Sequence, residues 1–222
     1  MKALLLAAGR GERMRPLTDD RPKPLLTVGR ESLIERHLRK LEEAGVRDVV
    51  VNLHYRGDLI QEALGDGQRY GLKITYSMEQ DLLETGGGAK QALGYLGEAP
   101  FIVVSSDILV DFDYQRLLEV DAVNNHLVLV RNPEHHPQGD FRLTASGCVR
   151  LGSEATFAGI GVITPDLIRN CPKAAFPLRD VLFPAASEGR LTGEMHLGYW
   201  SDVGTPERLA AAQADYESGL CR

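Results

Sequence analysis

Short apolar runs alternate with segments of helical periodicity along the first half of the chain, and this alternation restricts the fold more than any other feature. Four apolar runs are typical of buried strands, at residues 2–8, 48–53, 73–77 and 101–104. Helices are expected between them at 33–44, at 57–64, and from the glycine cluster 86–88 to residue 96. Strands that alternate with helices in this way predict a mostly parallel sheet.

The second half of the chain is less regular. Strands are expected at 126–131, 141–144, 156–163 and 194–200, a helix at 179–187, and a closing helix capped by Thr205 with Pro206 as its first residue. The two halves together predict the α/β class, with a Rossmann-like, mixed and mostly parallel sheet and helices on both faces. Because no internal repeat or linker interrupts the pattern, residues 1–222 are expected to form one domain.

Composition and charge exclude several other classes of protein. The 222 residues are 43% hydrophobic and carry a formal net charge of −6, which argues against disorder and against nucleic-acid binding through bulk charge. The first apolar run spans only Ala3 to Ala8 before Arg10, which is too short for a signal peptide or a membrane span. The three cysteines have no paired or metal-ligand spacing. We therefore expect a cytoplasmic protein that binds neither nucleic acid nor membrane.

A glycine-rich loop at residues 7–24 follows the first predicted strand directly. Glycines in such a place let the backbone approach an oxyanion closely, and ligands of parallel sheets lie beyond the carboxyl ends of the strands. A dinucleotide-binding loop needs a third glycine where Met14 stands, and the Gly-Lys-Ser/Thr of a Walker loop is absent. The loop therefore predicts a phosphate site of another kind.

The same loop concentrates positive charge in an otherwise acidic chain. It carries five cations within a short stretch: Arg10, Arg13, Arg15, Arg21 and Lys23. Cations so close together repel one another unless an anion joins them. The alternative is a basic surface turn, and the combination of glycines, prolines and cations favours a polyphosphate site over that alternative.

The run Gly9-Arg10-Gly11-Glu12-Arg13-Met14-Arg15-Pro16-Leu17-Thr18, with Pro22-Lys23-Pro24-Leu25 downstream, resembles the signature of the sugar-1-phosphate nucleotidyltransferases. The likeness extends over nearly the whole chain and is strongest for the compact bacterial members. It implies that Ala8, Gly9 and Gly11 wrap the phosphates of a nucleotide. It also implies that Arg13 and Lys23 bind those phosphates and neutralise charge during catalysis.

Two aspartates are candidates for a metal site. A nucleotide and a sugar phosphate bring several negative charges together, so a divalent cation is expected, and Mg²⁺ prefers one or two carboxylates plus phosphate oxygens. Asp107 ends an apolar strand, and Asp202 lies in the turn Trp200-Ser201-Asp202-Val203-Gly204-Thr205-Pro206-Glu207. The resemblance implies the same pair as metal ligands, with Asp107 also catalytic. The alternative for each aspartate is a purely structural role, at the end of a strand for Asp107 and in a turn near a helix start for Asp202. Ser105 and Ser106 precede Asp107 where relatives carry Asn-Gly or Gly, which leaves the roles of both serines open.

The segment from Gln80 to Gly88 resembles the part of the family that lies against the base and ribose. Gly86 and Gly87 would permit close approach to a flat ring, and the start of the following helix would add N–H donors. The amide of Gln80 has both a donor and an acceptor for a pyrimidine edge. Helix capping alone explains one glycine rather than three.

The sugar phosphate is assigned by resemblance to a set from the second half of the chain: Gly139, Asp140, Glu154, Gly159 and Asp180. Several relatives carry a lysine after the glutamate, whereas Ala155 follows Glu154 here. The basic contact to the sugar phosphate must therefore come from elsewhere or from the metal.

The resemblance implies transfer of a nucleotidyl group from an NTP to a sugar 1-phosphate, with Mg²⁺ as cofactor and pyrophosphate as the second product. UTP with N-acetylmuramate 1-phosphate, in cell-wall precursor recycling, is the favoured substrate pair. GTP with mannose 1-phosphate and dTTP with glucose 1-phosphate are the alternatives. A nucleotide-sensing regulatory module is the alternative outside the enzymes. A monomer or small homo-oligomer is expected.

Overall fold

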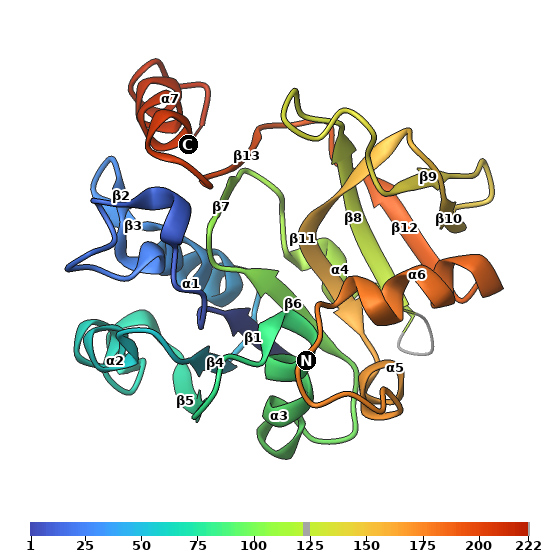
Figure 1. Ribbon diagram of the computed structural model, residues 1–222, viewed down its shortest axis with the longest axis horizontal. Helices are drawn as coiled ribbons and strands as arrows, with labels where there is room; N and C mark the ends of the chain where they lie inside the picture. The colour runs from blue at the N-terminus through green and yellow to red at the C-terminus, as the bar shows by residue number, and fades with distance from the viewer. Residues whose placement is uncertain (122–124, 222) are drawn as a thin grey trace.

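The computed structural model describes residues 1–121 and 125–221 and is built around a nine-stranded mixed sheet (Figure 1). Four strands form its parallel part, in the order β5-β4-β1-β6: β5 (Lys73–Met78), β4 (Asp48–Leu53), β1 (Lys2–Leu6) and β6 (Phe101–Ser105). The chain runs outward from β1 to β4 and β5 and then returns to β6 on the other side of β1. This reversal creates a crevice beyond the ends of β1 and β6, where ligands of such sheets bind.

The second half of the chain extends the sheet beyond β6. β11 (Ala155–Ile163) pairs antiparallel with β6, and β8 (Asn125–Arg131) pairs antiparallel with β11 and parallel with β12 (Leu191–Met195). β9 (Phe141–Leu143) and β10 (Val149–Leu151) form the outer hairpin. A mixed α/β sheet of the predicted kind is confirmed, with its antiparallel pairs gathered in this half.

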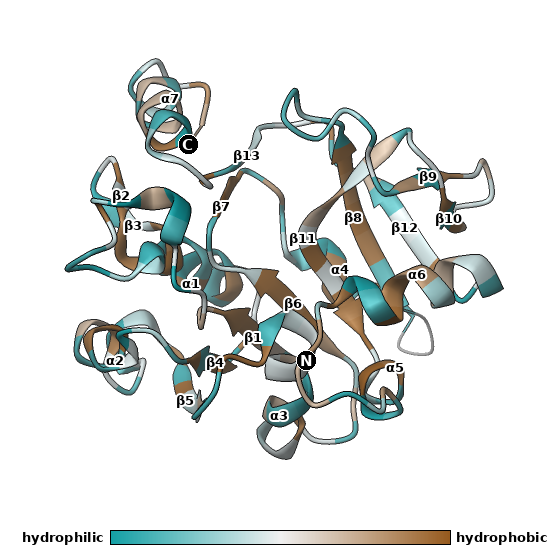
Figure 2. Cartoon of the chain, in the orientation of Figure 1, coloured by the Kyte–Doolittle hydropathy of each residue, from teal (hydrophilic) through white to brown (hydrophobic). Residues whose placement is uncertain are grey.

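Helices cover both faces of the sheet, as predicted. On one face lie α1 (Leu33–Glu43), α2 (Gly57–Leu64) and α4 (Gln115–Leu118), and on the other lie α3 (Glu84–Leu96), α5 (Pro165–Arg169) and α6 (Arg179–Glu188). Strand residues alternate between the two cores, so that Leu5 packs against α1 while Leu4 packs against the opposite layer. The central strands are accordingly apolar along their length, as Figure 2 shows.

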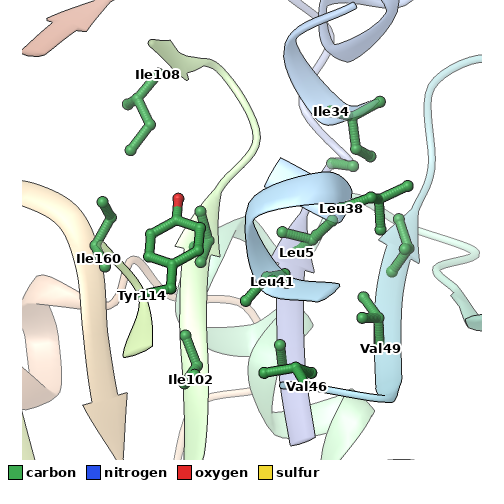
Figure 3. Packing of buried hydrophobic residues seen from close by; sticks show 14 of the residues in the cluster. Leu5, Ile34, Leu38, Leu41, Val46, Val49, Ile102, Ile108, Tyr114 and Ile160 are labelled. Carbon is green, nitrogen blue, oxygen red and sulfur yellow. The ribbon is translucent and has the colours of Figure 1, made fainter. Parts of the chain in front are cut away.

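The first core layer follows directly from the helical periodicity of α1. Ile34, Leu38 and Leu41 lie on one side of α1 and pack over Leu5 and Val49 (Figure 3). A capping box begins the helix: the Ser32 hydroxyl accepts from the Glu35 amide and the Glu35 carboxylate accepts from the Ser32 amide. Local signals therefore fix both the ends and the buried side of this helix.

One predicted strand is wrong. The expected strand at 194–200 is two strands, because β12 ends at Met195 and β13 (Trp200–Asp202) leaves the main sheet to pair with β7 (Ile108–Val110). The Asp111 amide donates to the Tyr199 carbonyl at 3.2 Å, which directs the chain toward the small sheet. The strands β7 and β10 and the helices α4 and α5 were not predicted.

The last helix of the chain packs against a small two-stranded sheet that comes before α1. The short strands β2 (Thr27–Val28) and β3 (Glu31–Ser32) lie beside α7 (Pro206–Glu217), whose Thr205 cap accepts from the Arg208 amide as predicted (Figure 1). Single 3₁₀ turns occupy Glu12–Met14, Lys23–Leu25 and Gln68–Tyr70. In the described part of the chain, no helix combines the length and the apolar character that crossing a membrane requires.

Candidate active site

A cleft of about 570 Å³ opens at the crevice between the ends of β1 and β6. Its walls are residues 6–14 with Lys23 and Pro24, residues 105–107, and Leu82, Glu84 and Thr85. Asn52, Pro177 and Gly204 complete the lining. The predicted loop, the end of β6 and the start of α3 are therefore brought together at one site.

The glycine-rich loop presents its backbone to this cleft. Ala8, Gly9 and Gly11 all line it, and a Cβ on Gly9 would have nothing within 4 Å. Gly11 has a φ of +64°, a left-handed conformation that favours glycine, and its carbonyl accepts from the Thr18 hydroxyl at 2.8 Å. The loop is thus folded back on itself while its backbone near Gly9 stays open to a ligand.

Lys23 and Asp107 form an ion pair inside the cleft. Lys23 Nζ donates to Asp107 Oδ2 at 2.6 Å, and Lys23 is buried while the Asp107 side chain is 42% exposed. Lys23 is the first residue of its 3₁₀ turn and lies between Pro22 and Pro24, which fix the backbone on both sides of it. The pair joins a buried cation to a carboxylate that lines the cleft.

The serines before Asp107 have structural contacts that the sequence did not reveal. The Ser106 hydroxyl donates to the Leu6 carbonyl at 2.6 Å, which ties the end of β6 to the end of β1. Ser105 lies against Gly159, where a φ of +80° and the nearby serine side chain leave no room for a Cβ. Ser105 and Ser106 therefore fix the backbone that carries Asp107.

A buried histidine supports Asp107 from behind. His37 Nε2 donates to the Ile108 carbonyl at 3.0 Å, and His37 Nδ1 accepts from the Tyr114 hydroxyl at 2.7 Å. Burial lowers the pKa of His37 to about 4, so the imidazole is neutral in this position. The Ile108–Leu109 peptide, one residue beyond Asp107, is thereby held by a group of the core.

The second predicted metal ligand, Asp202, has different neighbours. Arg208 Nη1 donates to both of its carboxylate oxygens, at 2.6 and 2.7 Å, and His135 Nε2 lies 3.1 Å from Asp202 Oδ1. These three residues line a second hollow of about 430 Å³, whereas the nearby Gly204 lines the cleft. The carboxylates of Asp107 and Asp202 thus lie in adjoining hollows, and their joint role as metal ligands stays a prediction.

Three of the five loop cations line the cleft: Arg10, Arg13 and Lys23. Arg13 is exposed and forms no ion pair with any residue that the structure describes, whereas Arg10 lies 4.0 Å from Glu12. Arg15 pairs with Asp19 at 3.4 Å and does not line the cleft. Arg13 is therefore available to an anionic ligand.

The residues predicted for the base are placed less directly. Gln80 is exposed and lies outside the cleft lining, and Gly86 and Gly87 are buried. The amides of both glycines donate to the Phe176 carbonyl, and a Cβ on either would overlap Phe176 or Ala174. Close packing against residues 174–176 thus accounts for these glycines, and their contact with a base stays a prediction.

The residues predicted for the sugar phosphate do not line the cleft. Asp140 accepts from the Phe157 amide at 3.1 Å, Asp180 pairs with Lys173 at 2.6 Å, and Glu154 is exposed. Gly139 has a φ of +56° at a crowded turn beside Asn132. Two members of this set contact residues of the cleft: Gly159 lies against Ser105, and the Asp180 amide donates to the Pro177 carbonyl at 3.0 Å.

The sequence analysis missed the residues that fasten the loop. Tyr55 donates through its hydroxyl to the Thr18 carbonyl at 2.9 Å, and Arg56 donates to the Asp19 carbonyl. Asn52 accepts from the Ala7 amide at 2.8 Å. All three follow or end β4, the strand beside β1, and their position at that edge was the signal available in the sequence.

The described residues offer few side-chain ligands for a metal ion. Residues 1–121 and 125–221 contain no group of three or more His, Cys, Asp or Glu side chains arranged to hold one. Magnesium bound to a nucleotide needs only one or two carboxylates, because phosphates and water complete its shell. Asp107 Oδ1 has no hydrogen-bond partner among the described residues and belongs to the cleft, so Asp107 fits such an ion.

The chain belongs to the nucleotidyl transferase family, whose model matches residues 2–155. It is 44% identical over 225 residues to the N-acetylmuramate alpha-1-phosphate uridylyltransferase of Neisseria meningitidis serogroup B, covering 96% of this chain and 97% of that protein. The enzyme of the same name from Caulobacter vibrioides is 37% identical, with 96% and 95% of the two chains covered. Members of this family generally use a divalent metal ion.

Solved structures agree with the fold. A putative glucose-1-phosphate thymidylyltransferase from Bacillus anthracis superposes with a TM-score of 0.87 at 22% identity, covering 96% of this chain and 94% of that one. A further relative by sequence is a mannose-1-phosphate guanyltransferase of Aspergillus fumigatus. It is 32% identical, and the match covers all of this chain and 66% of that protein.

Proposed function

We propose that this chain transfers the uridylyl group of UTP to N-acetylmuramate α-1-phosphate, giving UDP-N-acetylmuramate and pyrophosphate in the recycling of cell-wall precursors. The observation that carries the proposal is the 44% identity, over nearly the full length of both chains, to an enzyme of that name. The loop cations and Asp107 in one cleft support the same reaction class. We propose further that residues 1–222 act as one domain, in the cytoplasm.

The proposed reaction is a direct displacement at phosphorus. A phosphate oxygen of the sugar 1-phosphate attacks the α-phosphorus of UTP, the bond from that phosphorus to the bridging oxygen breaks, and pyrophosphate leaves with the bonding electrons. The attacking phosphate is largely ionised at neutral pH, so no protein base has to remove a proton. Catalysis then consists of positioning and charge neutralisation.

The residues of the cleft supply these two effects. Lys23 is within reach of the carboxylate that would hold the metal, so its ammonium would neutralise the α-phosphate beside that metal. Arg13, exposed at the rim and without an ion pair among the described residues, would bind the departing pyrophosphate. The backbone at Ala8, Gly9 and Gly11 would donate to the phosphates.

Asp107 would hold Mg²⁺, which when bound supplies a counter-charge for the α-phosphate. We propose Asp202 as the second carboxylate, which requires that it share or exchange its contact with Arg208. Gln80, Gly86 and Gly87 are proposed for the uracil side. Gly139, Asp140, Glu154, Gly159 and Asp180 are proposed for the sugar side.

A matrix of ATP, CTP, GTP, UTP and dTTP against three sugar 1-phosphates, read by pyrophosphate release, tests the proposed function. UTP with N-acetylmuramate α-1-phosphate should give the highest kcat/KM. A higher value for GTP with mannose 1-phosphate or for dTTP with glucose 1-phosphate would replace the proposed substrates. The absence of pyrophosphate release with every pair, from a protein that still binds nucleotide, would favour a nucleotide-sensing module.

A further inference from the structure

A buried carboxylate lies beneath the cleft without a cation beside it. Glu79 follows β5 and is only 5% exposed, and it forms no ion pair with the residues that the structure describes. Its Oε1 accepts from Asn52 Nδ2 at 2.6 Å, and its Oε2 accepts from the Leu83 amide at 3.0 Å. A buried carboxylate is tolerated when hydrogen bonds stabilise its charged form, so this arrangement depends on both donors.

Asn52 connects this carboxylate to the glycine-rich loop. The asparagine is 2% exposed at the end of β4, and its Oδ1 accepts from the Ala7 amide at 2.8 Å. A continuous series of hydrogen bonds therefore runs from Ala7 through Asn52 and Glu79 to Leu83. We call the Asn52 and Glu79 side chains the Asn52–Glu79 strap.

The two ends of the strap lie at opposite walls of the cleft. Ala7 begins the loop whose backbone lines one wall, and Leu83 directly precedes Glu84 and Thr85 of the other wall. Glu84 has a φ of +61°, a left-handed conformation that is unfavourable for a glutamate. Both backbone polar groups of the preceding Leu83 are hydrogen-bonded: its amide donates to Glu79 and its carbonyl accepts from the Phe176 amide at 3.1 Å.

The third glycine of the cluster is explained by the strap. A Cβ on Gly88 would overlap both Asn52 Nδ2 and Glu79 Oε1, whereas a Cβ on Gly94, in the same helix α3, would meet nothing within 4 Å. Both strap residues are themselves buried, at 2% and 5% exposure, so a methyl group at Gly88 would have to displace them. The sequence thus keeps a glycine where the strap passes the helix.

We propose that Glu79 is a positioning residue for the nucleotide: through Asn52 and Leu83 it fixes the spacing between the phosphate wall and the Glu84–Thr85 wall of the cleft. The proposal rests on the proposed function, because it assumes that the cleft holds an NTP across both walls. It assigns no contact between Glu79 and the substrate. Loss of the strap should weaken NTP binding and leave the sugar 1-phosphate largely unaffected.

The test removes one hydrogen bond of the strap while keeping the shape of the side chain. In Glu79→Gln only one of the two polar atoms accepts, so either Asn52 or Leu83 faces a second donor. We expect the Kd for UTP, measured by calorimetry with Mg²⁺ present and no sugar, to rise about tenfold or more. The KM for the sugar 1-phosphate should stay within about twofold. Both are measured where circular dichroism shows the variant fully folded.

A second pair of variants perturbs the same strap from helix α3. Gly88→Ala should raise the Kd for UTP as Glu79→Gln does, and Gly94→Ala, the same change in the same helix, should leave it unaltered. Unchanged UTP binding in both Glu79→Gln and Gly88→Ala overturns the proposal, as does an equal loss for UTP and sugar 1-phosphate. A wild-type chain that binds no NTP overturns the strap and the proposed function together. A wild-type chain that binds UTP but releases no pyrophosphate overturns the proposed function alone.

Discussion

Asp107 lies between β6 and β7, and Asp202 ends β13, the strand that pairs with β7, yet their surroundings differ. Asp107 and its neighbours are fixed by buried groups. Lys23 forms an ion pair with the carboxylate, the Ser106 hydroxyl donates to the Leu6 carbonyl of β1, and His37 donates to the Ile108 carbonyl. Asp202 is held by Arg208 and His135, two side chains that are themselves partly or largely exposed. The two carboxylates therefore differ in their partners rather than in burial, since the Asp107 side chain is 42% exposed and the Asp202 side chain 29%.

This difference indicates how much each carboxylate can move. The Asp107 backbone is anchored to both neighbouring strands, because its carbonyl also accepts from the Val203 amide at 2.9 Å. The Asp202 side chain is held by the side chains of Arg208 and His135, which are partly exposed and whose contacts are exchangeable in water. We therefore expect Asp107 to be the fixed point of the site and Asp202 to adjust around it.

The largest effect is expected from Asp107→Asn. The amide keeps the shape but removes the charge that faces the cleft, so kcat should fall about 10³-fold, as for other losses of preorganised charge. The rate of pyrophosphate release at saturating substrate concentrations measures kcat. Asp113→Asn, an exposed residue just after β7, should retain wild-type kcat. An Asp107→Asn variant within tenfold of wild type would remove Asp107 from the catalytic residues.

A smaller loss is expected from Asp202→Asn. If the side chain adjusts around a fixed Asp107, its replacement should lower kcat/KM about 10²-fold and raise the Mg²⁺ concentration needed for half-maximal rate. A magnesium titration at fixed UTP measures both values. Glu207→Gln, in the same turn and exposed, is the matched control. A larger loss for Asp202→Asn than for Asp107→Asn would reverse the comparison.

The buried support of Asp107 predicts an acid-sensitive stability. His37 is neutral in the fold with its pKa lowered to about 4, while an unfolded chain takes up its proton near the ordinary 6.5. Stability is therefore fully present above pH 6.5 and falls as the pH drops toward 4, by about 2 kcal/mol between pH 7 and pH 5. Urea unfolding at a series of pH values measures this slope.

His37→Gln is the control for that slope, because glutamine takes up no proton. The variant should be less stable at pH 7 and should lose less further stability than wild type between pH 6.5 and pH 4. Parallel curves for the two proteins would mean that other groups carry the acid sensitivity.

The smallest effect is expected from Arg208→Gln. The exchangeable pair with Asp202 is worth at most about 1 kcal/mol in a partly exposed place, so unfolding free energy should change little. Because the guanidinium then no longer competes for the carboxylate, the Kd for Mg²⁺ with UTP should fall a few-fold. Calorimetry checks this, with Arg169→Gln, which loses an exposed pair with Glu98, as the control. A weaker metal complex would show that Arg208 orients Asp202 instead.

The elements that could be predicted from the sequence are those set by neighbouring residues. The ends of α1 and the cap at Thr205 depend on side chains three positions apart, and both are confirmed. The break between β12 and β13 depends on pairing with β7, which lies far away in the chain and has no local signal. The predicted strand at 194–200 was wrong for that reason.

The site could be predicted in part for the same physical reason. Lys23 and Asp107 come from loops that follow adjacent parallel strands, so their position at the same edge of the sheet could be predicted. The partners of Asp202 could not be predicted, because His135 lies in a loop whose sequence has no periodic pattern. Gly86 and Gly87 were interpreted as space for a ring, whereas residues 174–176 fill the space beside them.

The Lys23–Asp107 pair has a consequence for which anions the cleft accepts. It presents opposite charges 2.6 Å apart, so a free phosphate or sulfate that approaches Lys23 also meets the repulsion of Asp107. A nucleotide that arrives with its own divalent cation satisfies both members at once. We therefore expect the pair to disfavour inorganic phosphate and sulfate in this cleft and to favour a ligand that carries both an anionic phosphate and a cation.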